Sequence, residues 1–220
     1  MTAVPSEPAA DQKQLLYFAD PMCSWCWGFQ PVIAGLAELH GDSLPIRPIM
    51  GGLRIGNEKV MTQEAKDEIR EHWEHVHEGT GQPFNFDFFD RDDFVYDTEL
   101  ACRAVVTSRG VEPRVSLSLL ARLQRAFYAE NQDITDRDTV IALAVDSGLE
   151  EAPFVNTFDS EEAKQVTAGD FELTQSIGVQ GFPTLLAGSY QDKFALVTTG
   201  YRPLEELAGP IADWLEEKPD

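Results

Sequence analysis

The sequence is poor in cysteine, in basic side chains and in long apolar runs. It holds three cysteines among 220 residues, and so low and odd a count excludes a framework of structural disulfides. Lys and Arg total 17 against 38 Asp and Glu, which gives a formal net charge of −21 at pH 7. A chain this acidic repels nucleic acid and anionic membrane surfaces. We therefore expect no nucleic acid and no membrane among its partners, and the sequence predicts no particular oligomeric state.

No apolar stretch approaches the roughly 18 residues that a membrane-spanning helix requires. Residues 1–13 contain neither the basic cap nor the apolar run of a secretory signal. We expect them to form a disordered tail, and we expect a cytoplasmic protein if Met1 is the native start. In a reducing cytosol, closely spaced cysteines are more often catalytic or metal-binding than structural.

Two of the three cysteines stand close together in the motif Cys23-Ser24-Trp25-Cys26. An apolar run at residues 15–18 predicts a buried strand at residues 14–19, before the motif, and the residues after the motif predict a helix. A Cys-x-x-Cys between a strand and a helix is typical of a thiol–disulfide site on a thioredoxin-like fold. Unpaired N–H groups at the helix start would stabilise a Cys23 thiolate. We expect Cys23 to be the exposed nucleophile and Cys26 the more buried resolving thiol.

Other roles for these cysteines stay open, namely a structural disulfide, half of a zinc site, or two unrelated buried thiols. A zinc site would need a second Cys-x-x-Cys or a nearby His pair, and neither completes the motif. His72, His75 and His77 are predicted to lie on a solvated helix face. Cys102 lies among apolar residues, so we expect an inert core thiol, with a redox partner as the alternative. No metal and no other cofactor is predicted.

The order of predicted elements is typical of an α/β protein that is interrupted by helices. A strand, a helix and a second strand come first and form a βαβ unit. A long helical block follows, and after it come a helix, a β-hairpin and a last helix. We therefore predict an α/β, thioredoxin-like fold with an inserted all-helical domain. Its parts are a first thioredoxin-like segment at 14–57, the inserted helical domain at 58–159, and a second thioredoxin-like segment at 160–220.

Local signals place several features within this order. The two prolines of the strand at 44–50 cannot donate hydrogen bonds to a neighbour, so we expect an edge strand. In the helical block, Gly110 predicts a helix end, and Thr135 predicts the start of another helix through a capping box. The phenylalanine-rich segment at 79–94 is predicted to be core between the two parts, with an apolar wall for unfolded peptides as the alternative.

Two further segments point to the same site as the cysteines. Gly51 and Gly52 follow the second strand, where open α/β sheets bind their ligands. We predict that their backbone lines the rim of the site, with a flexible turn as the alternative. Pro183 follows Phe182 and precedes an apolar strand. A cis bond there would leave the Phe182 backbone free to pair with an extended substrate peptide.

Five motifs spread over the chain carry a family resemblance. They are Asp20-Pro21-Met22-Cys23-Ser24-Trp25-Cys26-Trp27-Gly28, Gly51-Gly52-Leu53-Arg54, His72-Trp73, Thr80-Gly81-Gln82-Pro83-Phe84 and Gly178-Val179-Gln180-Gly181-Phe182-Pro183-Thr184. In combination they resemble the DsbA-like branch of the thioredoxin superfamily, and within it the FrnE-like proteins described as predicted protein-disulfide isomerases. The resemblance implies Cys23 as nucleophile, Cys26 as resolving thiol and Pro183 as a cis-proline.

The chain departs from that family at positions that tune the reaction. Ser24 and Trp25, between the cysteines, are predicted to contact substrate, and they differ from the corresponding pairs of DsbA and thioredoxin. The direction of electron flow therefore stays open. Tyr17 stands where those proteins carry a buried acid. Asp20 is predicted to handle the proton instead, or else only to form a turn.

We predict a thiol–disulfide oxidoreductase or protein-disulfide isomerase that works through the Cys23–Cys26 dithiol and a mixed disulfide. Its partners would be protein or small-molecule disulfides, with glutathione as a further candidate. One alternative is a glutathione-dependent transferase or isomerase of the kappa-class or hydroxychromene-carboxylate isomerase type, enzymes that typically carry Ser at the position of Cys23. Another is a non-enzymatic chaperone that binds apolar peptides.

Overall fold

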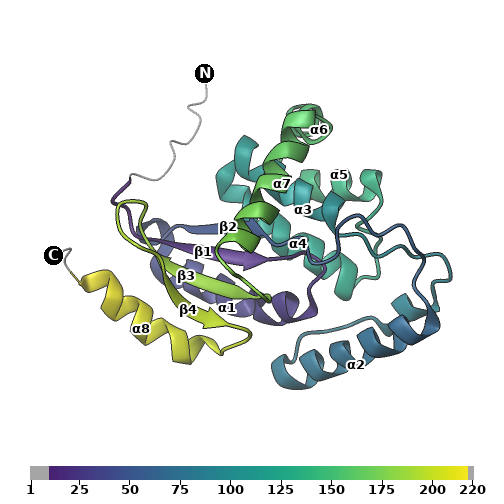
Figure 1. Ribbon diagram of the computed structural model, residues 1–220, viewed down its shortest axis with the longest axis horizontal. Helices are drawn as coiled ribbons and strands as arrows, with labels where there is room; N and C mark the ends of the chain where they lie inside the picture. The colour runs from purple at the N-terminus through teal and green to yellow at the C-terminus, as the bar shows by residue number, and fades with distance from the viewer. Residues whose placement is uncertain (1–9, 218–220) are drawn as a thin grey trace.

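A computed structural model describes residues 10–217, which form a four-stranded sheet flanked by helices (Figure 1). The strands are β1 (Gln14–Ala19), β2 (Ile46–Met50), β3 (Thr184–Gly188) and β4 (Ala195–Thr199), in the order β2-β1-β3-β4 across the sheet. β2 is thus an edge strand, as its prolines predicted, and β3 and β4 form the predicted hairpin. Of the expected disordered tail at 1–13, residues 1–9 lie outside the described part of the chain.

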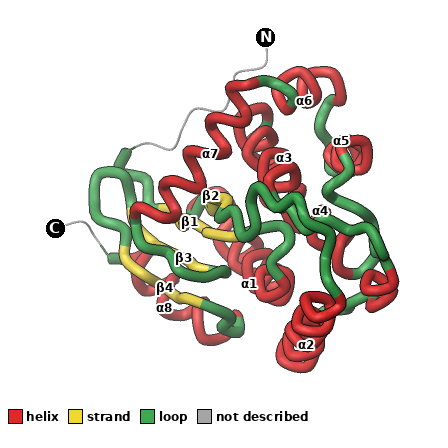
Figure 2. The backbone as a smooth tube through the Cα atoms, turned by 45° about the vertical axis from the view of Figure 1, so that its right-hand side comes forward, coloured by secondary structure: helices red, strands yellow, loops and turns green. Residues whose placement is uncertain are grey.

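The helices within residues 10–217 surround this sheet and extend beyond its β2 edge, as two views of the backbone show (Figure 1, Figure 2). They are α1 (Ser24–His40), α2 (Gln63–Thr80), α3 (Glu99–Val111), α4 (Ser116–Tyr128), α5 (Arg137–Asp146), α6 (Glu151–Phe158), α7 (Glu161–Ser176) and α8 (Leu204–Glu216), with short 3₁₀ turns at Gly41–Ser43, Phe86–Asp90 and Pro113–Val115. Because α2 to α6 follow β2 and precede β3, the α/β thioredoxin-like fold with a helical insertion is confirmed. The domain boundaries at 58 and 159 stay a prediction.

Strand pairing brings three chain segments to one end of the sheet. β1 runs parallel to β2, with Ala19 opposite Met50. β1 runs antiparallel to β3, with Phe18 opposite Thr184. Since β1 and β2 end where β3 begins, the segments after Ala19 and Met50 lie beside the segment before Thr184. This end of the sheet therefore gathers the segments that the sequence predicts to form the site.

The first strand is the centre of the core. β1 is buried along its whole length, which fits an unbroken apolar run between two neighbouring strands. Tyr17 faces the side of the sheet that α1 and α8 cover, whereas Phe18 faces the opposite side. α1 and the start of α8 meet closely at Gly35, where a Cβ atom would lie 2.5 Å from Leu204 Cδ2. A larger residue at position 35 would push the two helices apart.

The phenylalanine-rich segment packs around Trp73 of α2, which is 1% exposed. The Trp73 ring centroid lies 4.8 to 6.1 Å from the rings of four members of the segment, Phe84, Phe86, Phe88 and Phe89. Tyr128 of α4 joins this cluster and also stacks on Trp27 of α1. The segment is core, as predicted, and it extends from the insertion to the helix that carries the cysteines.

One predicted helix end is wrong. α3 continues through Gly110 and ends at Val111. The next residue, Glu112, leaves the helix with φ −147° and ψ 87°. It precedes Pro113, and the proline ring disfavours the helical conformation in the residue before it. The proline therefore decides where α3 ends, although glycine is the commoner signal.

The capping residue of α5 also differs from the prediction. The Asp136 side chain, not that of Thr135, accepts a hydrogen bond from the Thr139 N–H at 2.8 Å. Thr135 donates its hydroxyl to the carboxylate of Asp133 instead. An aspartate caps a helix as well as a threonine does. The sequence therefore predicted a side-chain cap at this helix start correctly, but the capping residue is the next one along the chain.

Candidate active site

Cys23 lies at the N-terminus of α1 and faces the segment before β3. It is the N-cap residue of α1, with extended backbone, and its thiol donates a 3.6 Å hydrogen bond to the carbonyl oxygen of Phe182. The Phe182–Pro183 peptide bond is cis. Two segments far apart in the sequence thus meet at the cysteine pair, in the arrangement that the sequence predicts for Cys23, Cys26 and Pro183.

Both thiols of the pair are shielded from solvent. Cys26 has no exposed surface, and Cys23 exposes 7% of its own. Cys26 is more buried than Cys23, as the sequence predicts. The prediction that Cys23 is exposed is wrong, because its thiol lies against the Phe182 carbonyl and the residue belongs to the hydrophobic core. Both cysteines are free thiols in this structure. Burial, together with the adjacent Cys23, raises the pKa of the Cys26 thiol well above its ordinary value.

The two residues between the cysteines, Ser24 and Trp25, are the first residues of α1. Ser24 and Trp25 are half-buried. The Trp25 ring lies 6.3 Å from the ring of Tyr201, which precedes α8. On its other side, the same indole would lie 3.8 Å from a Cβ placed on Gly79 of α2. Trp25 therefore forms part of the wall beside Cys23.

Gly51 packs directly under the ring of Phe182. A Cβ atom on Gly51 would overlap that ring, so glycine is required for the close approach of this backbone. Gly52 has a φ of +66° and packs against Phe171 of α7. The loop after β2 is thus fitted closely against Phe182, which favours the rim interpretation over that of a flexible turn.

Asp20 is a fully buried carboxylate beneath the active-site turn. One oxygen accepts the Met22 N–H at 2.8 Å, and the other accepts the Leu53 N–H at 2.7 Å and the Cys102 thiol at 3.3 Å. Burial raises the pKa of Asp20, although these donors oppose the shift. Asp20 therefore forms the expected turn, and it also ties that turn to the loop after β2.

Cys102 is buried, as predicted, but its polar neighbour was not foreseen. Burial and the nearby Asp20 carboxylate raise the pKa of the Cys102 thiol well above its ordinary value. The thiol is thus protonated at neutral pH and acts as a hydrogen-bond donor. Nothing in the sequence indicates this contact, because Cys102 stands in an apolar helical run far from Asp20 along the chain.

Trp27 joins the active-site helix to the insertion, and the sequence assigned it no role of its own. Its indole N–H donates to the Pro83 carbonyl at 3.0 Å, and its carbonyl accepts the Gln82 side-chain amide at 2.9 Å. Its ring stacks on that of Tyr128 at 6.4 Å and 8°. The available signal was that Trp27, Gln82 and Pro83 all belong to motifs that carry the family resemblance.

Metal-ligating side chains do not converge in the part of the chain that the structure describes. His72, His75 and His77 are exposed on α2, as predicted. Residues 10–217 contain no group of three His, Cys, Asp or Glu side chains placed to hold a metal ion. Over the same residues, no helix combines the length and the apolar character needed to cross a membrane.

A family model described as thioredoxin matches residues 16–208, from β1 into α8. The chain belongs to this thioredoxin family. The matched segment includes both the Cys23–Cys26 motif and Pro183. Solved structures of DsbA-like proteins share its fold, which confirms the resemblance that the motifs indicate.

Two solved proteins of this thioredoxin fold cover almost the whole chain. A protein from Nitrosomonas europaea described as a "putative protein disulfide isomerase" is 40% identical, with a TM-score of 0.84 over 93% of this chain and 98% of its own. The cytosolic disulfide reductase DsbM from Pseudomonas aeruginosa is 28% identical, with a TM-score of 0.73 over 92% of this chain and 95% of its own. A further DsbM structure is described as containing GSH.

Curated relatives of this thioredoxin-family chain are described as adapter proteins and not as disulfide reductases or isomerases. The ClpXP adapter protein SpxH of Halalkalibacterium halodurans is 25% identical over 96% of this chain. The chain spans 73% of the length of that protein and 59% of the length of the SpxH of Shouchella clausii. It therefore corresponds to part of the length of these adapter proteins.

Proposed function

We propose that the chain is a thiol–disulfide oxidoreductase in which Cys23 is the nucleophile and Cys26 the resolving thiol. The observation that carries the proposal is the position of the Cys23 thiol, at the N-terminus of α1 and 3.6 Å from the Phe182 carbonyl, with the buried Cys26 in the first turn beneath it. N–H groups at the start of a helix favour a thiolate there. A second thiol within one helical turn can resolve the adduct that the first one forms.

The reaction exchanges one disulfide for another. The Cys23 thiolate attacks one sulfur of a substrate R–S–S–R′, so the substrate disulfide breaks, R′S⁻ leaves and Cys23–S–S–R forms. Cys26 then loses its proton and attacks the Cys23 sulfur, which releases RS⁻ and forms the Cys23–Cys26 disulfide. Two electrons pass from the dithiol to the substrate. The two protons lost by the dithiol are recovered by RS⁻ and R′S⁻ through solvent.

Substrate contacts are proposed for the residues around the cysteine pair. The Phe182 backbone would pair with an extended substrate segment, because its carbonyl lies at the Cys23 thiol. Trp25 would supply an apolar wall, and Gly51, packed under the Phe182 ring, would fix that ring in place. Ser24 lies half-buried between the cysteines and would contact the bound disulfide. Asp20 would act on the site through the turn that it holds.

We propose reduction or isomerisation in a reducing cytoplasm, with glutathione as one small-thiol partner. Support comes from the relatives. DsbM, 28% identical, is described as a cytosolic disulfide reductase and has been solved with GSH. The 40% identical protein from Nitrosomonas europaea is described as a "putative protein disulfide isomerase".

The Cys26→Ser variant tests the proposal. Its Cys23 should form a mixed disulfide that cannot be resolved, so an adduct with a substrate peptide or with glutathione should accumulate on non-reducing gels and in intact-mass spectra. The matched Cys23→Ser variant should form no adduct and lose activity. If Cys26→Ser traps nothing and Cys23→Ser keeps a glutathione-dependent activity, the transferase alternative holds instead. The reduction potential of the Cys23–Cys26 pair then gives the direction of electron flow. A value of about −270 mV would indicate a reductant, and a value of about −120 mV an oxidant.

A second candidate is a peptide-binding adapter that needs no redox chemistry. The observation in its favour is the match of SpxH, described as a ClpXP adapter protein, over 96% of this chain. Binding of a partner peptide would then be the same in the Cys23→Ser/Cys26→Ser double variant as in the unaltered chain, and insulin disulfides would never be reduced. Insulin reduction that requires both cysteines would decide for the oxidoreductase.

A further inference from the structure

Tyr96 places a buried hydroxyl against the active-site turn, although it comes from a distant part of the chain. It lies in the segment between α2 and α3, and its side chain is 3% exposed. The hydroxyl donates a 2.5 Å hydrogen bond to the carbonyl oxygen of Met22, the residue before Cys23. The segment between β2 and β3 therefore reaches the peptide bond that carries the nucleophile.

Packing on several sides fixes the direction of the Tyr96 hydroxyl. The Tyr96 ring makes edge contacts with the rings of Phe94 and Phe127, each at 5.8 Å between centroids. The guanidinium of Arg54, in the loop after β2, lies 5.1 Å from the Tyr96 ring centroid. The Asn57 side-chain amide donates to the Tyr96 carbonyl at 3.2 Å. Both the backbone and the ring are thus held, and the hydroxyl has little freedom to leave Met22.

The hydrogen bond from Tyr96 completes a set that holds the backbone of Met22 and Cys23. The Met22 N–H donates to the Asp20 carboxylate at 2.8 Å, and the Cys23 N–H donates to the Asp20 carbonyl at 3.1 Å. The Cys23 carbonyl accepts the Trp27 N–H at 3.1 Å. Only the Met22 carbonyl is left, and within residues 10–217 the Tyr96 hydroxyl is its donor. Of these contacts, that from Tyr96 alone comes from outside residues 20–27.

The hydrogen bond also changes the charge that Cys23 meets. A carbonyl oxygen carries a partial negative charge, and a buried site screens that charge poorly. If the Met22 oxygen were unpaired, it would disfavour a negative charge on the adjacent Cys23 residue, and the Tyr96 proton offsets it. Burial raises the pKa of the Tyr96 hydroxyl, and the nearby Asp20 and Cys23 add to this effect. Tyr96 therefore keeps its proton at neutral pH and remains a donor.

We propose that Tyr96 is a positioning residue for the nucleophile, whose hydroxyl fixes the Met22–Cys23 peptide and thereby favours the Cys23 thiolate at the start of α1. This inference rests on the proposed function and adds to it a residue from the helical insertion. Tyr96 acts through the Met22 carbonyl and touches no reacting atom. The insertion would then influence both the rate at which Cys23 attacks a disulfide and the reduction potential of the Cys23–Cys26 pair.

The Tyr96→Phe variant tests this role, because it keeps the ring and removes only the hydroxyl. In the Cys26→Ser background, alkylation of Cys23 by iodoacetamide at pH 7 should slow about tenfold, the upper range for one hydrogen bond. Peptide mapping identifies Cys23 as the modified residue. With Cys26 present, the dithiol is equilibrated with glutathione, in the reaction that converts dithiol and GSSG to disulfide and two GSH.

The equilibrium with glutathione should move toward the disulfide in Tyr96→Phe. Its reduced form loses stabilisation of the thiolate, so the equilibrium constant for oxidation of the dithiol should rise about tenfold. For this two-electron couple the reduction potential would become about 30 mV more negative. Slower attack by Cys23 together with a more reducing potential is a combination that a general loss of packing does not produce.

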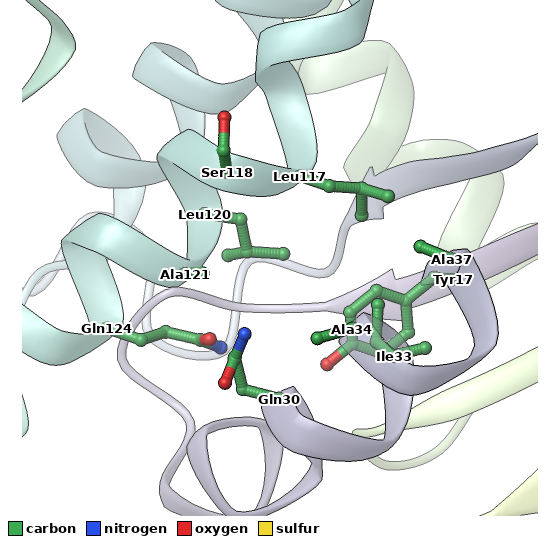
Figure 3. A pocket seen from close by; sticks show the side chains of 10 residues that line it. All are labelled: Tyr17, Gln30, Ile33, Ala34, Ala37, Leu117, Ser118, Leu120, Ala121 and Gln124. Atoms are coloured by element: carbon green, nitrogen blue, oxygen red, sulfur yellow. The ribbon is translucent and has the colours of Figure 1, made fainter. Parts of the chain in front are cut away.

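Leu120→Ala is the matched control for stability. Leu120 of α4 is 2% exposed and lines a crevice between α4 and α1 (Figure 3). Its truncation should lower the urea concentration at half unfolding, because it removes buried apolar contacts. Its side chain has no polar atom that could hold the active-site turn. Both the alkylation rate of Cys23 and the glutathione equilibrium should therefore match those of the unaltered chain.

The outcomes separate this inference from the proposed function. If Cys26→Ser forms no mixed disulfide, the oxidoreductase proposal itself fails. If it forms one, and Tyr96→Phe keeps both the alkylation rate and the equilibrium constant within twofold, the positioning role alone is overturned. A Tyr96→Phe variant that only unfolds at lower urea concentration, as Leu120→Ala should, would also overturn it, because that result describes a purely structural contact.

Discussion

The guanidinium of Arg109 and the carboxylate of Asp170 meet in two hydrogen bonds of 2.8 Å each. Both side chains also bind the edge strand β2. Arg109 donates to the Pro48 carbonyl at 2.6 Å, and Asp170 accepts the Met50 N–H at 2.9 Å. The pair thus joins α3 and α7 to the strand that leads into Gly51, and it links the insertion to the position of the active-site rim.

Removing one charge of this pair should be costly. The side chains of Arg109 and Asp170 are only 12% and 8% exposed, so Asp170→Asn leaves a buried, uncompensated cation. We expect a loss of about 3 kcal/mol in the free energy of unfolding, measured by urea denaturation. Asp138→Asn breaks an exposed pair with Arg137 and is the matched control, which should show no measurable change. Equal midpoints for the two variants would contradict this account.

Gly51→Ala should impair activity by displacing the Phe182 ring. The added methyl group overlaps that ring, and overpacking of this kind costs about 1–3 kcal/mol. Because movement of the ring also shifts the Phe182 carbonyl, kcat/KM for a disulfide substrate should fall roughly tenfold. Gly169→Ala, on α7 with open space around it, should leave kcat/KM unchanged. The stabilities of Gly51→Ala, Phe182→Leu and the double variant should be non-additive, and additive values would exclude the clash.

The buried Cys26 should be a poor nucleophile toward external reagents. Burial is the main cause that raises the pKa of its thiol, so the thiolate fraction is small at neutral pH. In Cys23→Ser, alkylation of Cys26 by iodoacetamide should be slow at pH 7 and should keep rising through pH 9 without a plateau. Peptide mapping identifies the modified cysteine, and the urea-unfolded chain supplies the reference rate. Rapid labelling that levels off below pH 8 would be inconsistent with the structure.

Cys102 should affect stability through the pKa of Asp20. Its thiol is one of the donors that lower that pKa against the larger effect of burial, so Cys102→Ala should raise it further. An acid with a raised folded-state pKa holds its proton more tightly in the folded chain, so stability falls as pH rises from the unfolded value, about 4, through the folded value. Cys102→Ala should therefore lose more unfolding free energy than the unaltered chain across this window.

The control for this experiment is Cys102→Ser, which keeps a hydroxyl donor for Asp20. Urea unfolding at a series of pH values between 4 and 8 measures both variants. Parallel pH profiles for the alanine and serine variants would show that the Cys102 hydrogen bond has no influence on Asp20.

Much of the fold follows from local patterns in the sequence. The apolar run of β1 predicted a buried strand, and the prolines of β2 predicted an edge strand. The first signal reflects burial of both faces of the strand, and the second reflects the backbone donors that proline lacks. The meeting of Cys23 with Pro183 followed from the order of elements, because a βαβ unit and an antiparallel hairpin leave only one end of the sheet for both. Gly110 failed as a helix end because Pro113 is the stronger local constraint.

The side-chain contacts around the site could not be read in the same way. The hydrogen bond from Cys102 to Asp20 and the pairing of Arg109 with Asp170 each join residues that are distant in the chain. Such contacts depend on how the helices pack against one another. Helix periodicity predicts which face of a helix is buried, but it does not predict which residues that face contacts. The exposure of Cys23 was misjudged for the same reason, since the carbonyl that covers it comes from Phe182.

The bonds between Trp27 and the Gln82–Pro83 segment have a consequence for protein engineering. A Cβ on Gly28 would lie 2.9 Å from Val76 and Thr80 of α2, so the active-site helix is shaped to the surface that the insertion presents. Excising the insertion would strip Trp27 of both hydrogen-bond partners and of its stacked ring. The inserted helices therefore cannot be deleted without loss of contacts that hold the active-site helix. A transplant of this Cys-x-x-Cys helix into another scaffold would have to carry α2 and the Gln82–Pro83 turn with it.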